Sequence, residues 1–356
     1  MSLKVLIMAA GTGGHVFPGL AVAARLQDKG AHVRWLGTPH GLENRLVPEA
    51  GIDLTAIDIA GVRGKGVAGW LALPSRVLGA MVAAWRAFRQ DRPDVVVSMG
   101  GYVAGPGGLV AKLMGIPLIL HEQNAIAGLT NRWLAPWAAK IFTGFPGVFK
   151  RGVCVGNPVR ADIKALDPPQ LRWEDRAGPL RVLIIGGSLG ARIFAERIPQ
   201  ALAQLPTGTS LQITHQAGRV LDEAKTHYAA VSLPQGVRVE LVEFIDDMAA
   251  AWAHADVAIT RAGALTVAEL AAAGVGALLV PFALAVDDHQ SANAAFLSDA
   301  GAAWLLPETA ATVERLAQWF GELDRESLLQ RAVRARAVAR TDAAEHVAEA
   351  CWAVAA

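Results

Sequence analysis

A histidine directly behind a glycine-rich turn is the first feature of the sequence that could do chemistry. His15 ends the segment Gly11 to His15 (GTGGH), which follows the apolar stretch Lys4 to Ala10. Glycines after a strand allow a tight turn and bring backbone amides close to an anion or a sugar at a helix N-terminus. An imidazole at that place can act as a general base near neutral pH. The glycines alone fit a simple turn equally well, and His15 favours a catalytic site.

The same turn lacks the features of a dinucleotide-binding site. That fingerprint needs a third glycine where Val16 stands, and an acidic residue at the end of the second strand, where the sequence has His32 to Trp35. We therefore expect no nicotinamide, no flavin and no other cofactor.

A second glycine-rich turn, Gly186 to Arg192 (GGSLGAR), follows another apolar strand. It lacks the Gly-Lys-Ser/Thr ending of a P-loop, which argues against hydrolysis of a nucleoside triphosphate. Its backbone amides and the Ser188 hydroxyl suit a diphosphate, and Arg160 is placed to add a charge-assisted contact.

A third turn, Thr260 to Thr266 (TRAGALT), ends a strand and opens a helix that we expect over Val267 to Ala273. Gly263 permits the turn, and the amides that follow form an anion site. Glu269 is expected in the first turn of this helix. It is either a surface carboxylate favoured by the helix dipole or a bidentate acceptor for two ribose hydroxyls.

Polar residues also crowd the segment Asp287 to Asn293 (DDHQSAN), after the next strand. Two acids and a histidine suggest a metal site, but no ligand set with zinc-like spacing completes it. The sequence also has no Asp-x-Asp pair. We therefore expect no metal.

Two more segments of the first half stand at the exits of strands: Gly100 to Gly108 (GGYVAGPGG) and His121 to Asn124 (HEQN). The glycines imply close backbone approach to a bulky group, although in isolation a packing turn explains them better. Four polar side chains in a row after a strand are more typical of a functional site than of a structural one.

Two copies of an α/β fold are needed to position these segments. Apolar strands are predicted at 4–10, 33–36, 94–98, 117–121, 181–185, 211–214, 237–241, 257–260 and 277–280, with a helix over about 17–29. This alternation predicts two Rossmann-like, doubly wound α/β domains, 1–157 and 158–340, with a helix at about 341–356 packing back on the first. Ligands of open α/β sheets bind outside the carboxyl ends of the strands, so we expect the site in a cleft between the halves.

The composition limits the class of protein. Of 356 residues, 53% are hydrophobic and 18% are charged, which excludes disorder, and the two cysteines, Cys154 and Cys351, exclude a disulfide scaffold. A net charge of +1 argues against a nucleic-acid partner. The charge is uneven, because residues 1–150 hold 15 Lys and Arg against 8 Asp and Glu and the remainder is acidic.

The stretch Gly61 to Arg92 mixes apolar and basic residues. They are Trp70, Leu71, Leu73, Val77, Leu78, Met81, Val82, Trp85 and Phe88, with Arg63, Lys65, Arg76, Arg86, Arg89 and Arg92. Such a stretch fits a surface that settles on anionic lipid and an amphipathic core helix about equally well. The uncharged segments 95–111 and 270–286 are better explained as buried strand–turn–helix pieces than as membrane spans. With no signal peptide in view, we expect a cytoplasmic protein.

Together these segments resemble the MurG family of glycosyltransferases. The matching segments are GTGGHVFPGLAVA, SMGGYVAGPGGL, HEQNAIAGLTNRWLA, GNPVR, GGSLGAR, EFIDDM and RAGALTVAELAAAG, in the family's order over roughly the first 300 residues. The resemblance implies the GT-B fold and an inverting transfer of N-acetylglucosamine from UDP-N-acetylglucosamine in peptidoglycan synthesis. The acceptor would be the 4-hydroxyl of N-acetylmuramic acid in undecaprenyl-diphospho-muramoyl-pentapeptide. The enzyme would be peripheral on the cytoplasmic face of the cell (inner) membrane, with the anionic lipid surface as a partner.

The resemblance also implies roles for single residues. His15 would be the base, and Tyr102 and Glu122 would lie on the acceptor side. The contacts to UDP-N-acetylglucosamine would be Thr12, Gly13, Gly14, Asn124, Arg160, Ser188, Ile245, Ala264, Leu265, Thr266, Val267, Ala268, Glu269, His289 and Gln290.

Three positions depart from the family pattern: Ala10, Leu189 and His289. Leu189 weakens any role of that side chain in phosphate binding, and His289 leaves open whether it or Gln290 meets the sugar. Two other functions stay open on the same fold. One is a UDP-sugar epimerase, and the other is a non-catalytic nucleotide-sugar sensor.

Overall fold

The chain divides into two compact units, each built on one parallel β-sheet. The structure is a computed structural model that describes residues 2–11, 13–59, 73–187, 190–283, 285 and 288–355. The first unit comprises Met1–Arg160 with Thr341–Ala356, and the second comprises Ala161–Arg340. The first unit thus extends three residues past the predicted boundary at 157 and includes the C-terminal helix.

The sheet of the first unit has the strand order β3-β2-β1-β4-β5-β6-β7, and every pair is parallel. Its strands are β1 (Lys4–Met8), β2 (His32–Gly37), β3 (Asp53–Ala56), β4 (Val95–Ser98), β5 (Leu118–Glu122), β6 (Lys140–Thr143) and β7 (Val153–Cys154). Its helices are α1 (Gly13–Asp28), α2 (Glu43–Glu49), α4 (Leu73–Gln90), α5 (Ala104–Leu113), α6 (Leu129–Leu134), the 3-10 turn η1 (Ala135–Trp137) and α16 (Ala343–Ala355).

Both faces of this sheet are buried, and the residues of β1 alternate between them. Val5 and Ile7 belong to the core formed with α1 and α16, whereas Leu6 and Met8 belong to the core formed with α4, α5 and α6. A strand buried on both faces has to be apolar throughout, which explains the uninterrupted run of apolar residues in β1.

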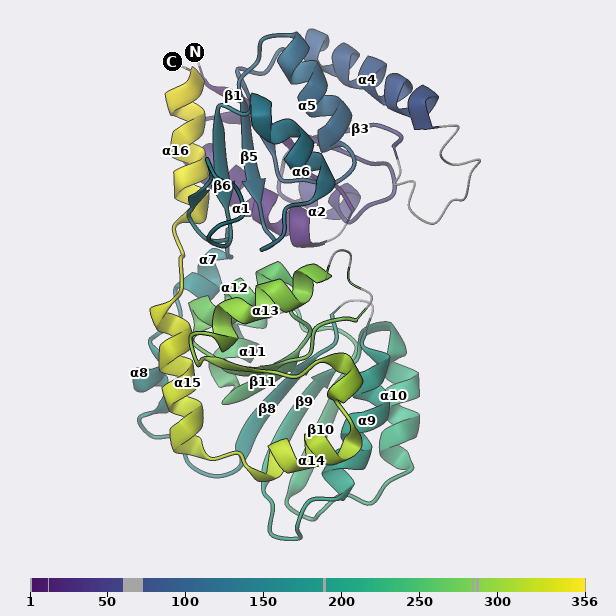
Figure 1. The fold of residues 1–356 in the computed structure, drawn as a ribbon, viewed down its shortest axis with the longest axis vertical. Coiled ribbons are helices and arrows are strands. Elements are labelled where there is room, and N and C mark those ends of the chain that lie inside the picture. The colour runs from purple at the N-terminus through teal and green to yellow at the C-terminus, as the bar shows by residue number, and fades with distance from the viewer. Residues whose placement is uncertain are drawn as a thin grey trace. The chain divides into compact units, whose positions relative to one another are not determined.

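The helix α16 packs against α1 of the first unit, as Figure 1 shows for the yellow helix beside the purple and teal elements. Val347 and Cys351 are fully buried in that core. At the rim, Arg25 Nε lies 3.0 Å from a carboxylate oxygen of Glu345. Small residues of α16 at helical spacing permit this close packing, because alanine side chains let two helix backbones approach.

The sheet of the second unit has the order β10-β9-β8-β11-β12-β13 and is also parallel. Its strands are β8 (Leu180–Ile185), β9 (Leu211–Gln216), β10 (Val237–Val242), β11 (Val257–Thr260), β12 (Gly276–Leu279) and β13 (Ala303–Leu305). Its helices are α7 (Ala161–Lys164), α8 (Pro169–Trp173), α9 (Arg192–Ala203), α10 (Leu221–Ala229), α11 (Met248–His254), α12 (Ala264–Ala273), α13 (His289–Ser298), α14 (Val313–Gly321) and α15 (Arg325–Ala337), with the 3-10 turns η2 (Gly218–Val220) and η4 (Glu308–Ala310).

Two parallel, doubly wound sheets were predicted, and the structure confirms them. Each predicted strand is present within two residues of its expected bounds, while β3, β6, β7 and β13 were not predicted. In the part of the chain that the structure describes, no helix combines the length and the apolar character needed to cross a bilayer.

The docking of α16 has a measurable chemical consequence at Cys351. Burial raises the pKa of the Cys351 thiol to about 12, so the reactive thiolate is scarce at pH 8. In a Cys154→Ser variant we expect Cys351 to react with a thiol reagent about a thousandfold more slowly than free cysteine, and to react fast in denaturant. A Cys351→Ser variant, which keeps only Cys154, is the control. Reaction of native Cys351 at the rate of a free thiol would show that α16 is not docked.

Candidate functional site

The carboxyl ends of β1, β4 and β5 bring the sequence motifs of the first unit together. These three strands are neighbours, with Met8 paired to Ser98 and Ser98 paired to Leu120. The strand order reverses at β1, and in open α/β sheets such a switch point is where ligands bind. The segments that follow the three strands are Gly11 to His15, Met99 to Tyr102 and Gln123 to Asn124.

His15 lies in the first turn of α1, which corrects the expectation that it sits on a loop and that the helix begins near Phe17. The helix starts at Gly13, and Pro18 lies inside it. A Cβ at Gly13 would lie 2.9 Å from the Phe17 ring, so a side chain there would require this ring to shift. Gly13, Gly14 and His15 are all half-buried, and Thr12 lies outside the described residues.

The imidazole of His15 is held from two sides. Its Nδ1 lies 3.0 Å from Oε1 of Gln123. Gly100, with φ of +93°, closes the other side, because a Cβ there would lie 3.1 Å from Cε1 of His15. The glycine after β4 is therefore needed both for its left-handed backbone and for its close approach to the histidine.

His121 is fully buried and stays neutral. Its Nε2 lies 2.9 Å from the carbonyl oxygen of Gly156, and its Nδ1 lies 3.1 Å from Nε2 of Gln123. Burial lowers the pKa of His121 to about 4, against the opposing effects of the Gly156 carbonyl and the Glu122 charge. At neutral pH this ring therefore carries a single proton.

Glu122 is also buried, and its carboxylate accepts hydrogen bonds from three residues. Oε1 accepts from the backbone N–H of Asn124 at 3.0 Å and from its side chain at 3.3 Å. Oε2 accepts from the Gly128 N–H and from the Asn131 side chain, both at 3.0 Å. This carboxylate holds the loop after β5 in shape, whereas Tyr102, the other predicted acceptor-side residue, is 55% exposed.

A buried carboxylate that the sequence analysis missed, Glu43, holds the first glycine turn. Oε1 of Glu43 accepts from the Thr38 N–H at 2.9 Å and from the Thr38 hydroxyl at 2.7 Å. Oε2 accepts from the Gly11 N–H at 3.2 Å. Nothing in the local sequence marks this residue, because a glutamate at the start of a helix is ordinary.

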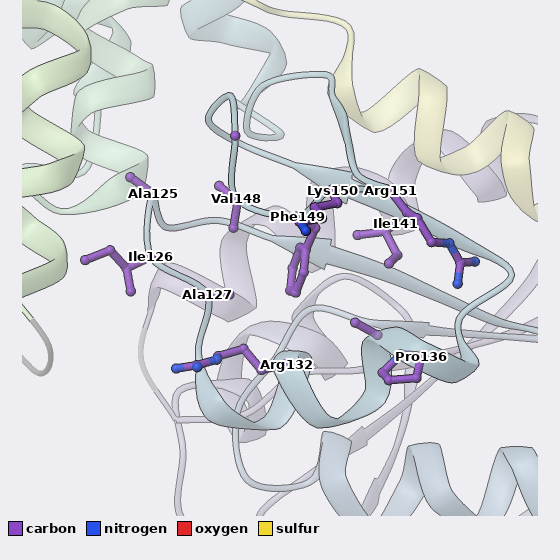
Figure 2. A pocket seen from close by; sticks show the side chains of 12 residues that line it. Ala125, Ile126, Ala127, Arg132, Pro136, Ile141, Val148, Phe149, Lys150 and Arg151 are labelled. Atoms are coloured by element: carbon purple, nitrogen blue, oxygen red, sulfur yellow. The ribbon is translucent and has the colours of Figure 1, made fainter.

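An open hollow of about 660 Å³ lies beside the loop after β5, within the first unit (Figure 2). Residues 125–127, the helix α6 with η1, and residues 147–151 form its walls. Arg132, Lys150 and Arg151 line it among mostly apolar side chains, and Arg151 also donates to the Ala138 carbonyl at 3.3 Å. Part of its lining belongs to the segment HEQNAIAGLTNRWLA, but only the folded chain brings that segment together with residues 147–151, so the sequence analysis did not find the hollow.

In the second unit, the turn after β8 approaches a neighbouring loop closely. At Gly190, with φ of +76°, a Cβ would lie 2.2 Å from the carbonyl oxygen of Ala217. The helix α9 follows, and its N-cap residue Ala191 has no polar side chain to cap it. Ser188 and Leu189 lie outside the described residues.

The helix α12 begins at Ala264, three residues before the predicted start, with Gly263 as an N-cap that has no side chain. The first-turn N–H groups of Leu265 and Thr266 therefore have no i−4 carbonyl within the helix. The turn itself is fixed by Asn293, whose side chain donates to the Ala262 carbonyl at 3.1 Å. Ala264 and Val267 are buried, and Leu265, Thr266 and Ala268 are half-buried.

Because α12 begins earlier, Glu269 lies in its second turn, and the prediction of a first-turn position is wrong. The side chain is half-buried rather than fully solvated. Its Oε2 accepts a hydrogen bond from the indole N–H of the buried Trp252 at 3.3 Å. This bond orients the carboxylate of Glu269.

The helix α13 begins at His289, after Asp288 in a left-handed conformation with φ of +51°. Oε1 of Gln290 accepts the backbone N–H of Phe282 at 2.9 Å. His289 and Gln290 are both half-buried, and Asp287 lies outside the described residues. The segments 264–269 and 288–290 follow β11 and β12, which are adjacent strands.

Ile245 and Arg160 belong to other segments of the sequence. Ile245 is half-buried after β10 and lines a cavity of about 280 Å³ along the sheet, close to the lower size limit of about 300 Å³ for ligand sites. Arg160 is half-buried at the end of the first unit. Within the described residues, no three His, Cys, Asp or Glu side chains are grouped so as to hold a metal ion.

Comparison with known proteins decides the family. Residues 5–143 match the glycosyltransferase family 28 N-terminal domain, and residues 181–348 match the C-terminal domain of that family. A relative from Bordetella parapertussis is 53% identical over 348 residues, covering 98% of this chain and 96% of the relative. It is named UDP-N-acetylglucosamine--N-acetylmuramyl-(pentapeptide) pyrophosphoryl-undecaprenol N-acetylglucosamine transferase. A relative of the same name from Dechloromonas aromatica is 51% identical over 352 residues, covering 99% of both chains.

The crystal structure of MurG from Acinetobacter baumannii is 45% identical and superimposes with a TM-score of 0.85, covering 99% of both chains. The chain belongs to the MurG family. As a member of this glycosyltransferase family it has the GT-B type of fold, and the epimerase alternative is not favoured. The calicheamicin glycosyltransferase CalG4, at 17% identity and a TM-score of 0.69, shares the fold alone.

In this MurG family member the geometry around Gly11 predicts the effect of changing Glu43. In a Glu43→Gln variant one acceptor oxygen of the buried side chain is replaced by an amide donor, so this donor faces the N–H of Gly11 or of Thr38, and that N–H loses its partner. Such a loss costs about 1–3 kcal/mol, and we expect the first unit to melt about 3–8 °C lower in scanning calorimetry. Glu49, on the same helix but exposed, provides the control variant Glu49→Gln, which should melt as the wild type does. Identical melting of all three proteins would mean that Glu43 does not hold the turn.

Proposed function

We propose that the protein transfers N-acetylglucosamine from UDP-N-acetylglucosamine to the 4-hydroxyl of N-acetylmuramic acid in undecaprenyl-diphospho-muramoyl-pentapeptide. The transfer inverts the anomeric centre: the hydroxyl oxygen bonds to C1 of the sugar while the bond from C1 to the UDP oxygen breaks. The observation that carries the proposal is a histidine fixed at the switch point of the first sheet, in a chain that belongs to the MurG family.

His15 is the base in this reaction. It takes the proton of the attacking hydroxyl as the new C–O bond forms, and UDP leaves with its negative charge. Contacts on both sides of the ring support this role. Gln123 lies at Nδ1, Gly100 lies beside Cε1, and among the described residues Nε2 has no hydrogen-bond partner in the protein. A general base of this kind contributes about 10²–10⁴ to the rate.

The donor contacts lie mainly on the second unit. The N–H groups at the start of α12 and in the turn Gly186 to Ala191 suit the diphosphate, with Ser188 and Arg160 as further donors. Glu269, with Trp252 bonded to one carboxylate oxygen, suits the ribose hydroxyls, and Ile245 lies by the uracil. Since Oε1 of Gln290 is bonded to Phe282, its amide N–H groups and His289 remain as sugar contacts. Charge stabilisation by helix N-termini needs no proton transfer to the leaving group.

The remaining donor contacts, Thr12, Gly13, Gly14 and Asn124, belong to the glycine turn and the loop after β5 in the first unit. The acceptor is assigned to this same unit, with Tyr102 in direct contact. Glu122 acts on the acceptor side indirectly, through the loop that its carboxylate holds. The hollow lined by Arg132, Lys150 and Arg151 supports an anionic acceptor with apolar parts.

A face of α4 supports binding to an anionic membrane. Leu78, Val82 and Trp85 follow helical spacing and are 62%, 43% and 37% exposed, whereas Ala80, Ala84 and Phe88 form the buried face. The exposed arginines of this helix are Arg76, Arg86 and Arg89. The core-helix interpretation therefore accounts for one face, and the other face has the apolar and basic character of a lipid-binding surface. Arg63, Lys65, Trp70 and Leu71 of the predicted stretch lie outside the described residues.

The direct test is an assay for release of UDP from UDP-N-acetylglucosamine, with and without the lipid-linked muramoyl-peptide. We expect release that depends on the acceptor. In a His15→Ala variant kcat should fall about 10²–10⁴-fold while KM for the UDP-sugar changes less than about twofold. His32, exposed at the amino end of β2, provides the control variant His32→Ala, which should keep full activity.

Two results would contradict this assignment. Formation of free sugar or an epimer without acceptor indicates an epimerase, and tight binding of the UDP-sugar without any turnover indicates a sensor. A loss of turnover matched by an equal loss of UDP-sugar affinity in His15→Ala contradicts the base role.

For the membrane, we expect the wild type to float with phosphatidylglycerol vesicles at low salt. A Trp85→Glu/Arg86→Glu variant should float several-fold less, because it replaces an apolar and a cationic contact with two anions. Leu171→Glu/Arg238→Glu, a matched change at exposed positions of the second unit, should float as the wild type does. If the wild type fails to float, the proposed lipid surface on α4 is wrong.

A further inference from the structure

A chain of hydrogen bonds runs from a backbone carbonyl to the proposed base. The carbonyl oxygen of Gly156 lies 2.9 Å from Nε2 of His121. Nδ1 of His121 lies 3.1 Å from Nε2 of Gln123, and Oε1 of Gln123 lies 3.0 Å from Nδ1 of His15. All four residues belong to the first unit, and His121 and Gln123 are at most 1% exposed.

The direction of each bond follows from the groups involved. A carbonyl oxygen only accepts, so Nε2 of His121 carries the proton and donates it to Gly156. The buried His121 is neutral, since its pKa lies near 4, and its Nδ1 therefore has a lone pair and needs a donor.

The side-chain amide of Gln123 supplies that donor, and a second contact fixes its orientation. Nε2 of Gln123 lies 3.1 Å from Nδ1 of His121 and 3.2 Å from the His121 carbonyl oxygen. Both are acceptors, so both amide hydrogens are used. The reversed amide would place Oε1 against two acceptors, which would leave buried groups unsatisfied at a cost of about 1–3 kcal/mol.

With the amide oriented in this way, its oxygen faces Nδ1 of His15. An amide oxygen only accepts, so Nδ1 of His15 carries a proton, and in the neutral ring the lone pair lies on Nε2. The main chain of Gln123 is fixed as well, because the side chain of Asn157 donates to its carbonyl oxygen at 3.0 Å.

We propose that Gln123, oriented by His121 and Gly156, is a positioning residue that holds His15 in the tautomer with a free lone pair on Nε2. This proposal rests on the proposed function only in taking His15 as the base. The acceptor proton goes to Nε2, and the imidazolium that results keeps its Nδ1–H bond to Gln123. This chain of hydrogen bonds has a neutral amide at the position where a serine hydrolase has a carboxylate. The amide therefore sets the tautomer of His15 without adding a negative charge beside the ring.

The test is ¹⁵N NMR of histidine-labelled protein at pH 8, with the His15 signals assigned by their absence in a His15→Gln variant. We expect Nδ1 of His15 and Nε2 of His121 to be protonated, and Nε2 of His15 and Nδ1 of His121 to be unprotonated. This measurement on the wild type needs no enzymatic turnover. An Nε2–H tautomer of His15, or an even mixture of the two, overturns the proposal.

Two variants connect the tautomer to catalysis. Gln123→Met keeps the length of the side chain but removes its three hydrogen bonds to His15 and His121. We expect a mixed His15 tautomer, kcat reduced about 10- to 100-fold and an unchanged KM for the UDP-sugar. Gln123→Glu still accepts from Nδ1 of His15, so it should restore the tautomer signature and part of the lost kcat, even if it folds less stably than wild type.

The outcomes separate this proposal from the proposed function. If the expected tautomer is found and is lost in Gln123→Met, but His15→Ala keeps its turnover, the positioning by Gln123 stands and the base role of His15 fails. If Gln123→Met keeps the wild-type tautomer, Gln123 does not position His15, whatever the activity of the enzyme.

Discussion

The polar side chains buried at the end of β5 have to be satisfied by hydrogen bonds, and the rest of the first unit's site is arranged around that need. His121, Glu122 and Gln123 are each at most 2% exposed. A buried polar group without a partner costs about 1–3 kcal/mol, and more if it is charged. Their partners come from several segments: α1 supplies His15, the loop before α6 supplies Gly128, and the segment after β7 supplies Gly156. Three neighbouring polar residues therefore tie together the loops that surround the proposed base.

Both units use the same device to bring main chain close to other groups. In the first unit Gly100 leaves space for the His15 ring, and in the second unit Gly190 lets the turn after β8 approach the Ala217 carbonyl. A side chain would crowd the His15 ring at Gly100 and collide with the main chain at Gly190, and at each place the positive φ favours glycine. The two glycines follow different strands of their sheets, β4 in the first unit and β8 in the second.

The strands that could be predicted from the sequence are those with long apolar runs, because burial on both faces leaves a signal in each residue. β3, with only half-buried and exposed residues, and the three-residue β13 carry no such signal. The starts of α1 and α12 were placed too late, since glycines such as Gly13, Gly14 and Gly263 near a helix start look like loop residues in the sequence. The motif His121 to Asn124 could be recognised in the sequence as a group of polar residues after a strand. The sequence does not show which of these side chains are buried. It also does not show that Glu122 binds its own loop, because that depends on contacts with Gly128 and Asn131. Glu43 was missed because only the folded chain brings it to Gly11 and Thr38.

The position of α16 affects how the chain folds while it is being translated. The core of the first unit includes Ala343, Val347 and Cys351, which are translated after the whole of the second unit. While the ribosome is still making residues 161–340, the apolar surface of α1 that α16 will cover is open to water and to other chains. Once residue 340 has been made, the second unit has its complete core and can fold. The first unit, although most of it is made earlier, reaches its final packing only when α16 follows. A nascent chain of this kind is exposed to aggregation or chaperone binding throughout that interval.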